Sequence, residues 1–244
     1  NSPSAPFASF DFSTNPGWTT EGDWAFGVPL GNAGDPLSGN TGSNVYGYNL
    51  AGAYPDNLAP TNLTTSAINC SGKAGVHLKF WRWLGIENYI YDSASVLVSN
   101  NGTSWTTVWT HDGLSFSDVA WVQQDFDISA VADNQSTVYV RWVMGATDFS
   151  VTYGGWNIDD VSLEGQSVLT MSSAVWVDFA YAGVESGTQA QPYNTFAEGH
   201  LAVIPGGAIN IKGDTADHTG NESARVTRPV TIAAVNGPVA IGAP

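Results

Sequence analysis

The side chains of this sequence that could perform catalysis are few and scattered. The chain lacks the H-E-x-x-H, G-x-S-x-G, P-loop and G-x-G-x-x-G motifs. Asp125 and Asp127 flank a phenylalanine, which is typical of the solvated face of a strand. No two of the four histidines have the spacing of metal ligands: His77, His111, His200 and His218. His77 alternates with apolar residues, which is typical of a structural residue in a strand. We therefore predict that the protein is not an enzyme.

Aromatic side chains offer a second kind of chemistry, because an exposed indole or phenol ring can stack on a sugar. The chain has ten Trp, and a long tract from Gly27 to Pro60 is too polar to form a core. Four tryptophans on apolar runs are predicted to lie in the core: Trp81, Trp83, Trp142 and Trp156. Five other aromatic residues, in or near the polar tract, are the candidates for glycan contact: Trp18, Trp24, Tyr46, Tyr48 and Tyr54.

The charge balance restricts the possible partners. Seven Lys+Arg against 22 Asp+Glu give a formal net charge of -15, so no basic stripe is available for nucleic acid or an anionic membrane surface. Excess carboxylates in loops more naturally hold hard cations such as calcium, although they also simply keep a secreted protein soluble. No apolar stretch approaches the roughly 18 residues of a membrane-spanning helix. Membrane insertion is therefore not expected.

The composition favours an extracellular protein. Only 12% of the residues are charged, about half the usual share, and Gly, Ser, Thr and Asn replace them. Cys70 is the only cysteine, so no intrachain disulfide is possible and a buried thiol is expected. The chain starts at Asn1 without a methionine, which fits a mature, processed form. We expect a secreted protein, located outside the cell or on its surface.

Residues 1–165 are predicted to form one all-β domain. Large apolar and polar residues alternate along several runs, and NNGT, HDG and ADNQ turn signals separate them at the spacing of a sandwich. In VYVRWV, the charged Arg141 between apolar neighbours indicates a strand with one face in the core and one in solvent. Residues 166–174 are expected to form a connector.

Residues 175–244 have a different pattern. An expected strand at Val175–Phe179 precedes a polar loop and a short amphipathic helix over about Tyr193–Ile204. A Pro-Gly-Gly turn leads to a strand at Ala208–Lys212, and two more apolar strands are expected at Val230–Val235 and Val239–Ile241. The predicted fold class is therefore all-β, with a jelly-roll β-sandwich followed by a small, incomplete β-helix-like unit that has one short helix.

Several segments support the jelly-roll interpretation by resemblance. Between Ser99 and Gly165 the chain contains SNNGTSWTTVW, WVQQDFDISAVADNQSTVYVRW and GGWNIDDVSLEG, and FASFDF and DWAFGVP lie near its start. Together they resemble the jelly-roll domains of the cleaved-adhesin and MAM-like group, found in secreted bacterial proteins. The resemblance covers roughly residues 8–165. It implies a non-catalytic module that binds glycans or proteins.

The same resemblance implies structural calcium, held by Asp11 near the first strand and by the pair Asp159–Asp160. Calcium takes six to eight oxygen ligands from carboxylates and loop carbonyls, and adjacent aspartates repel each other unless a cation or a donor lies between them. In an extended strand, Asp159 and Asp160 are expected to point to opposite faces. Asp23 and Glu87 are further candidate oxygen donors.

The second unit resembles the N-terminal cap of the right-handed β-helix of polysaccharide lyases. The matching residues are V-D-F-A, P-Y-N-T at the start of the helix, and the coil P-G-G-A-I-N-I-K. Asn194 or Thr195 is expected to cap the helix. A solenoid buries its core only by stacking coils, so the last coil leaves an open apolar face. The candidate assembly residues are on this face: Val230, Ile232, Val235, Val239 and Ile241.

Three functions remain open from the sequence. In the first, the protein is a structural or adhesion protein that associates with itself, and the open coil of one copy is covered by the next in an oligomer or a filament. In the second, it is a carbohydrate-binding or adhesion module for an extracellular glycan or protein. In the third, it is an accessory part of a larger secreted hydrolase or lyase.

Overall fold

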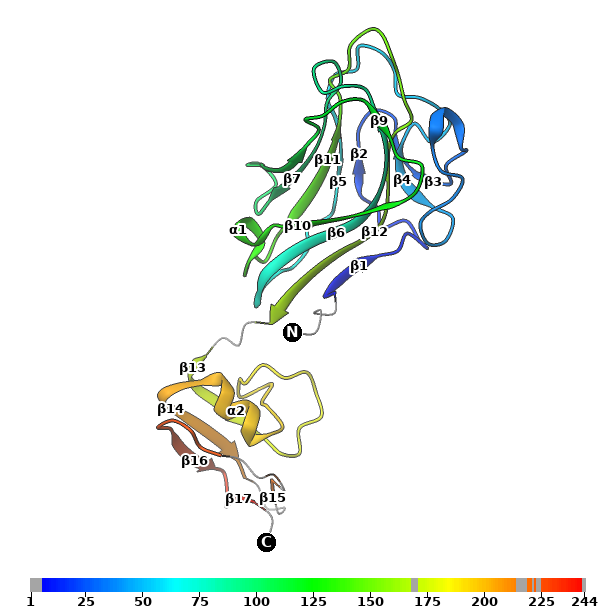
Figure 1. Cartoon of the computed structure of the whole chain (residues 1–244). Helices are drawn as coiled ribbons and strands as arrows, with labels where there is room; N and C mark the ends of the chain where they lie inside the picture. The colour runs from blue at the N-terminus through cyan, green and yellow to red at the C-terminus, as the bar shows by residue number, and fades with distance from the viewer. Residues whose placement is uncertain (1–5, 168–170, 214–218, 221, 223–224, 243–244) are drawn as a thin grey trace. The chain divides into compact units, whose positions relative to one another are not determined.

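The computed structural model describes residues 6–167, 171–213, 219–220, 222 and 225–242. The chain divides into two compact units, Asn1–Val168 and Leu169–Pro244, and Figure 1 shows both. Each unit has a hydrophobic core of its own. Within the described residues, no helix is long and apolar enough to span a membrane.

The first unit is an antiparallel β-sandwich, as its alternating runs predict. One seven-stranded sheet has the order β10-β6-β12-β4-β3, with β1 paired to β12 and β9 to β6. The facing sheet has five strands in the order β2-β5-β11-β7-β8 (Figure 1). The strands are β1 (Ala8–Phe10), β2 (Thr19–Thr20), β3 (Trp24–Gly27), β4 (Val45–Tyr48), β5 (Thr61–Thr64), β6 (Lys73–Ile86), β7 (Ala94–Ser99), β8 (Thr106–Thr110), β9 (Phe116–Ser117), β10 (Val122–Asp127), β11 (Tyr139–Met144) and β12 (Gly155–Ser167).

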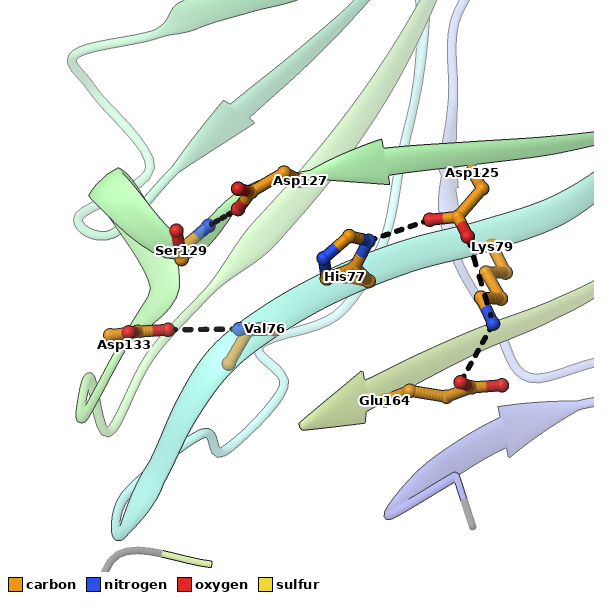
Figure 2. A network of polar contacts seen from close by, with 8 residues as sticks. All are labelled: Val76, His77, Lys79, Asp125, Asp127, Ser129, Asp133 and Glu164. Carbon is orange, nitrogen blue, oxygen red and sulfur yellow. Dashed lines mark hydrogen bonds and ion pairs between the residues drawn. The ribbon is translucent and has the colours of Figure 1, made fainter. Parts of the chain in front are cut away.

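Two short helices interrupt the strands of this unit. A 3-10 turn, η1 (Asn32–Gly34), lies within the polar tract between β3 and β4, and the one-turn helix α1 (Ser129–Ala132) follows β10. Asp133, just after α1, accepts hydrogen bonds from the backbone N–H of Gly75 and Val76 at 2.9 and 3.0 Å. The turn after α1 is thereby fixed to the start of β6 (Figure 2).

The core of the sandwich is built from the inner faces of the two sheets. Trp142 on β11 and Trp156 on β12 are fully buried, as the sequence predicts. Trp18 stacks on Trp142 with ring centroids 5.7 Å apart, and on Tyr46 at 5.1 Å. Aromatic packing of this kind contributes large buried areas, so these rings hold the two sheets together. Cys70 is also buried here, and burial raises the pKa of its thiol to about 11, which makes it unreactive.

The second unit is a small parallel structure. Strands β13 (Ser172–Val177), β14 (Val203–Lys212) and β16 (Thr231–Val235) form one parallel sheet, in that order. Strands β15 (Thr219–Gly220) and β17 (Ala240–Ile241) form a second parallel pair. Strands β14 and β15 are followed along the chain by β16 and β17, and each of the later strands pairs with one of the earlier ones. Ala208 of β14 pairs with Thr231 of β16, and Thr219 of β15 pairs with Ala240 of β17.

Helix α2 (Phe196–Ala202) is shorter than the predicted Tyr193–Ile204, because the chain enters β14 directly at Val203. Thr195 caps the helix, its hydroxyl accepting a hydrogen bond from the N–H of Glu198. Phe196 and Ala202 of the helix pack into a core with residues of β13 and β14, among them Val177 and Ile209. The apolar side of the helix therefore covers the sheet.

Candidate functional site

The predicted calcium residues lie where β1 and β12 meet the loop between β3 and β4. Asp159 is fully buried, and its carboxylate accepts hydrogen bonds from the backbone N–H of Thr41 and Asp160, at 3.0 and 2.8 Å. Burial is the main cause that raises its pKa to about 6. The Asp160 carboxylate accepts hydrogen bonds from the side chains of Asn40 and Thr41. Both carboxylates therefore contact the same loop.

The prediction that Asp159 and Asp160 point to opposite faces is wrong. A β-bulge interrupts the pairing of β12 with β6 after Asp159, and Asp160 has the left-handed φ of 47°. This conformation turns Asp160 back toward the loop instead of letting the strand alternate. Asp160 and Asp11 line one hollow of about 200 Å³, although the Asp11 carboxylate is itself bonded to Ser13.

Several oxygen acceptors lie close to Asp159. Gly39 passes so close that a Cβ at this position would lie 2.4 Å from the carbonyl oxygen of Thr41, 2.6 Å from Oδ2 of Asp159 and 2.9 Å from the carbonyl oxygen of Asn44. Three oxygen acceptors thus lie close together around Gly39, whose own backbone occupies the space between them, and carboxylate and carbonyl oxygens are the ligands that calcium prefers. Asp159, Thr41 and Asn44 are the residues that could hold the ion.

The predicted glycan platform is wrong. All five of its aromatic residues lie in the sandwich core with at most 5% of their surface exposed, so no sugar can reach their ring faces: Trp18, Trp24, Tyr46, Tyr48 and Tyr54. Strand β4, inside the polar tract, carries Tyr46 and Tyr48 into the core, and β3, just before the tract, carries Trp24 there. Tyr54 is anchored by its hydroxyl, which donates to Asp92 at 2.6 Å.

Trp81 and Trp83 are partly exposed, which corrects their predicted place in the core. Along β6 the side chains of Leu78, Phe80 and Leu84 are buried, so the odd-numbered positions face outward. The indole N–H of Trp83 donates to the carbonyl of Gly34 at 2.8 Å, so this side chain contacts the loop between β3 and β4. Trp81 pairs across the strands with Gln123 of β10 and Asp159 of β12.

Charged side chains continue this outer surface beside Trp81. The Lys79 amine donates to Glu164 of β12 at 2.8 Å and lies 3.7 Å from Asp125 of β10 (Figure 2). His77 Nδ1 lies 2.7 Å from the other oxygen of Asp125 (Figure 2). The hydrogen bond from Lys79 to Glu164 is the main cause that raises the pKa of the lysine. We call this surface the polar face; it comprises His77, Lys79, Trp81, Gln123, Asp125 and Glu164.

The polar face combines side chains that recognise polyhydroxylated ligands. The carboxylates of Asp125 and Glu164 accept hydrogen bonds, and the protonated amine of Lys79 donates them. The His77 and Asp125 side chains are exposed by 42% and 49%, so they are accessible to a ligand. The strand alternation of β6 could have revealed this face, since it assigns His77, Lys79 and the indoles to one side.

A second group of carboxylates lies beyond the ends of the strands. Oxygen atoms of Glu87, Asp92 and Asp148 lie within 4.8 Å of one another. Glu87 therefore belongs to a different cluster from Asp159, contrary to its predicted role as a further ligand there. Such a trio could hold a cation or a positively charged side chain.

The histidines do not assemble a catalytic group in the described part of the chain. His77 pairs with Asp125, His111 is buried with Nε2 2.8 Å from the carbonyl of Glu87, and His200 is buried in the second unit. No serine, threonine or cysteine among the described residues contacts His77 as a nucleophile would contact its base. His218 lies outside the described residues.

The predicted assembly residues lie on the last turn of the second unit. Ile232 on β16 and Ile241 on β17 are exposed, by 46% and 41%. Val230 and Val239 pack partly against the small core, and Val235 is half-buried. Among the described residues, β16 lies at one edge of its sheet, opposite β13.

The comparisons with known proteins concern the fold of about two-thirds of the chain. The sequence matches no known family model and no curated protein sequence. Among solved structures, the chain is similar to the K3 cleaved adhesin domain of Lys-gingipain from Porphyromonas gingivalis W83, with 17% identity and a TM-score of 0.41, over 66% of this chain and 100% of that one. It is also similar to the CBM22-1 xylan-binding domain of Paenibacillus barcinonensis Xyn10C, with 13% identity and a TM-score of 0.43, over 68% and 97%. A third similar structure is CsCBM6-3 from Clostridium stercorarium in complex with cellobiose. It has 12% identity and a TM-score of 0.35, over 66% of this chain and 95% of that one.

Proposed function

We propose that the first unit is a non-catalytic, extracellular binding module, and that its polar face binds a polysaccharide. One observation carries this proposal: an accessible row of hydrogen-bonding side chains from three strands lies next to the partly exposed indole of Trp81. A sugar ring can stack its C–H face on an indole while its hydroxyls exchange hydrogen bonds with charged neighbours. Xylan and cellobiose, which the names of two of the similar structures give as ligands, are the first compounds to test.

The ion pairs of the polar face suit binding better than catalysis. Lys79 has a raised pKa, so its amine stays protonated near neutral pH and donates hydrogen bonds instead of accepting a proton. Its contacts with Glu164 and Asp125 hold these three side chains in place before a ligand arrives. A site ordered in advance loses less side-chain entropy on binding.

We further propose that calcium bound at Asp159 has a structural role. The carbonyls of Thr41 and Asn44 belong to the loop between β3 and β4, and Asp159 belongs to β12. An ion shared by these groups would neutralise the buried carboxylate and hold the loop against the sheet. The polar face, built on the neighbouring strand β6, would then keep its shape.

The test is polysaccharide binding by the intact chain in calcium-containing buffer. Affinity electrophoresis against xylan, glucans and other polysaccharides should show retardation that Trp81→Ala abolishes. Trp105→Ala is the matched control, because Trp105 directly precedes β8 of the other sheet, where the guanidinium carbon of Arg141 lies 3.8 Å from the centre of its ring. Equal retardation of the wild type and Trp81→Ala would refute the proposed site.

A second candidate function is self-association through the second unit. We propose that its stacked parallel strands are the beginning of a β-helix and that a second copy pairs with the outer edge of β16. That strand, Thr231–Val235, is uncharged and exposes Ile232, and such an edge is a template for further strand pairing. Ile232→Lys should convert oligomers to monomers in light scattering; a wild type that is monomeric at micromolar concentration removes this candidate.

The third function, an accessory part of a larger hydrolase or lyase, is compatible with a polysaccharide-binding first unit.

A further inference from the structure

Three loops form one end of the first unit, at its top in Figure 1. They are residues 87–93 between β6 and β7, 111–115 between β8 and β9, and 145–154 between β11 and β12. Backbone hydrogen bonds join them, from Tyr89 N–H to the Gly113 carbonyl at 3.1 Å and from Ser93 N–H to the Ala146 carbonyl at 2.9 Å. The three loops therefore form one connected surface, separate from the polar face.

This surface exposes an unusual number of large apolar side chains. Phe149 and Leu114 are each 78% exposed, and four more are exposed by 47% or more. We call the group the loop-end patch; it comprises Tyr89, Ile90, Tyr91, Leu114, Phe149 and Val151. Single apolar residues on a surface are ordinary, whereas six on three connected loops are typical of an interaction site.

The carboxylate trio of Glu87, Asp92 and Asp148 lies on the same loops. Asp92 is buried and accepts hydrogen bonds from the Tyr54 hydroxyl at 2.6 Å and from the Asp148 N–H at 3.0 Å. The Ser150 N–H donates to Asp148 at 2.8 Å, and the Ser150 hydroxyl lies 2.8 Å from Asp148 and 3.4 Å from Glu87. Asp148 and Ser150 flank Phe149 in the chain, so the acidic groups lie directly beside the apolar ones.

No lysine or arginine balances this negative charge within the described residues. The four Lys and Arg of the first unit are engaged elsewhere: Lys73 with Ser167, Lys79 with Glu164, Arg82 with Asp118, and Arg141 with Thr64 and Trp105. Desolvation, together with the charges of Asp148 and Asp92, raises the pKa of Glu87. The trio thus lacks a positive partner of its own.

We propose that the loop-end patch binds a protein segment that presents a lysine or arginine among apolar side chains. The apolar residues of the patch would bury the apolar part of the segment, and the trio would receive its cationic group. Charge decides between partners: nucleic acid and anionic lipid are repelled, and a second copy of a chain with net charge -15 has the wrong sign.

The probe is a set of synthetic fluorescent decapeptides that place one lysine among Leu, Phe and Trp in varied order, each paired with its N-acetyl-lysine version. Fluorescence anisotropy should show binding that is at least about tenfold tighter for the lysine version and that weakens as salt screens the charges. Phe149→Ser should weaken binding by about tenfold or more. Val184→Ser is the matched control, because Val184 is 77% exposed in the other unit.

Results of three kinds would overturn the proposal. The first is that no peptide of the set binds at 100 μM, a concentration of the order used to detect weak contacts. The second is equal affinity for lysine and acetyl-lysine versions, or unchanged binding by Phe149→Ser. The third is displacement of the peptide by about 1 mM calcium, which would assign the trio to a metal ion. None of these results bears on Trp81, so the polysaccharide proposal is tested separately.

Discussion

The buried carboxyl of Asp35 gives a prediction that follows directly from its contacts. Asp35 follows η1 and is 7% exposed. Its Oδ1 accepts a hydrogen bond from Nδ2 of Asn157 at 2.7 Å, whereas its Oδ2 has no hydrogen-bond partner among the described residues. Burial raises its pKa to about 7, and the hydrogen bond from Asn157 offsets only part of this effect. The ionised form of Asp35 therefore destabilises the folded state.

The sign and size of the effect follow from linkage. The folded-state pKa of about 7 lies above the ordinary value of 3.8, so the folded protein holds the proton more tightly than the unfolded chain. The stability from this group is fully present below about pH 4 and is lost as the pH rises to about 7. A shift of about three pKa units corresponds to at most about 4 kcal/mol.

The substitution Asp35→Asn keeps an acceptor for the Asn157 side chain and removes the charge. We expect it to raise the free energy of unfolding at pH 8 by as much as about 4 kcal/mol and to leave it nearly unchanged at pH 4.

The assay is urea unfolding of wild type and Asp35→Asn at pH 4 and pH 8, in EDTA so that no divalent cation contributes. Tryptophan fluorescence reports mainly on the first unit, because nine of the ten Trp precede Val168. The pKa of Asp159 is raised as well, but Asp159 is present in both proteins. The difference in their free energies of unfolding therefore reports on Asp35 alone. A variant that is less stable than wild type at pH 8, or a difference that does not change with pH, would refute the reasoning.

The remaining predictions concern the calcium site, the polar face and the second unit. Calcium at about 100 times its Kd should stabilise the wild type by about 3 kcal/mol, and Asp159→Asn should remove this gain in calorimetry; a wild type insensitive to calcium contradicts the site. Lys79→Met should weaken polysaccharide binding about tenfold and cost at most about 1 kcal/mol of stability, because its ion pairs are partly exposed. Binding equal to wild type would exclude the amine from the site. Ile232→Lys should lower the particle mass in light scattering if copies associate through β16, and an unchanged mass excludes that edge.

The sandwich of the first unit was predictable from strand alternation. The run VYVRWV became β11, with Val140, Trp142 and Met144 buried and Arg141 facing out. The same rule applied to β6 assigns Trp81 and Trp83 to the outer face. The prediction that Trp81 and Trp83 lie in the core rests on the large apolar area of tryptophan. It does not take account of which face of β6 each position occupies.

The candidate sites depended on contacts that the sequence does not reveal. The tract from Gly27 to Pro60 is polar enough to be a loop, yet β4 at its centre carries Tyr46 and Tyr48 into the core. The bulge at Asp160 depends on how a distant loop packs, because Asn40 and Thr41 bind the carboxylate from about 120 positions away in the chain. No local pattern marks such a pairing. The loop-end patch likewise unites three loops only after folding.

Binding of a polysaccharide to the polar face is the central claim, and isothermal titration with the most strongly retarding polysaccharide tests it most directly. Wild type and Trp105→Ala should bind with the same affinity, whereas Trp81→Ala should lose at least about tenfold while unfolding at the same urea concentration as the wild type or close to it. Equal binding by Trp81→Ala and wild type, or no binding of any polysaccharide by the calcium-loaded wild type, would contradict the claim.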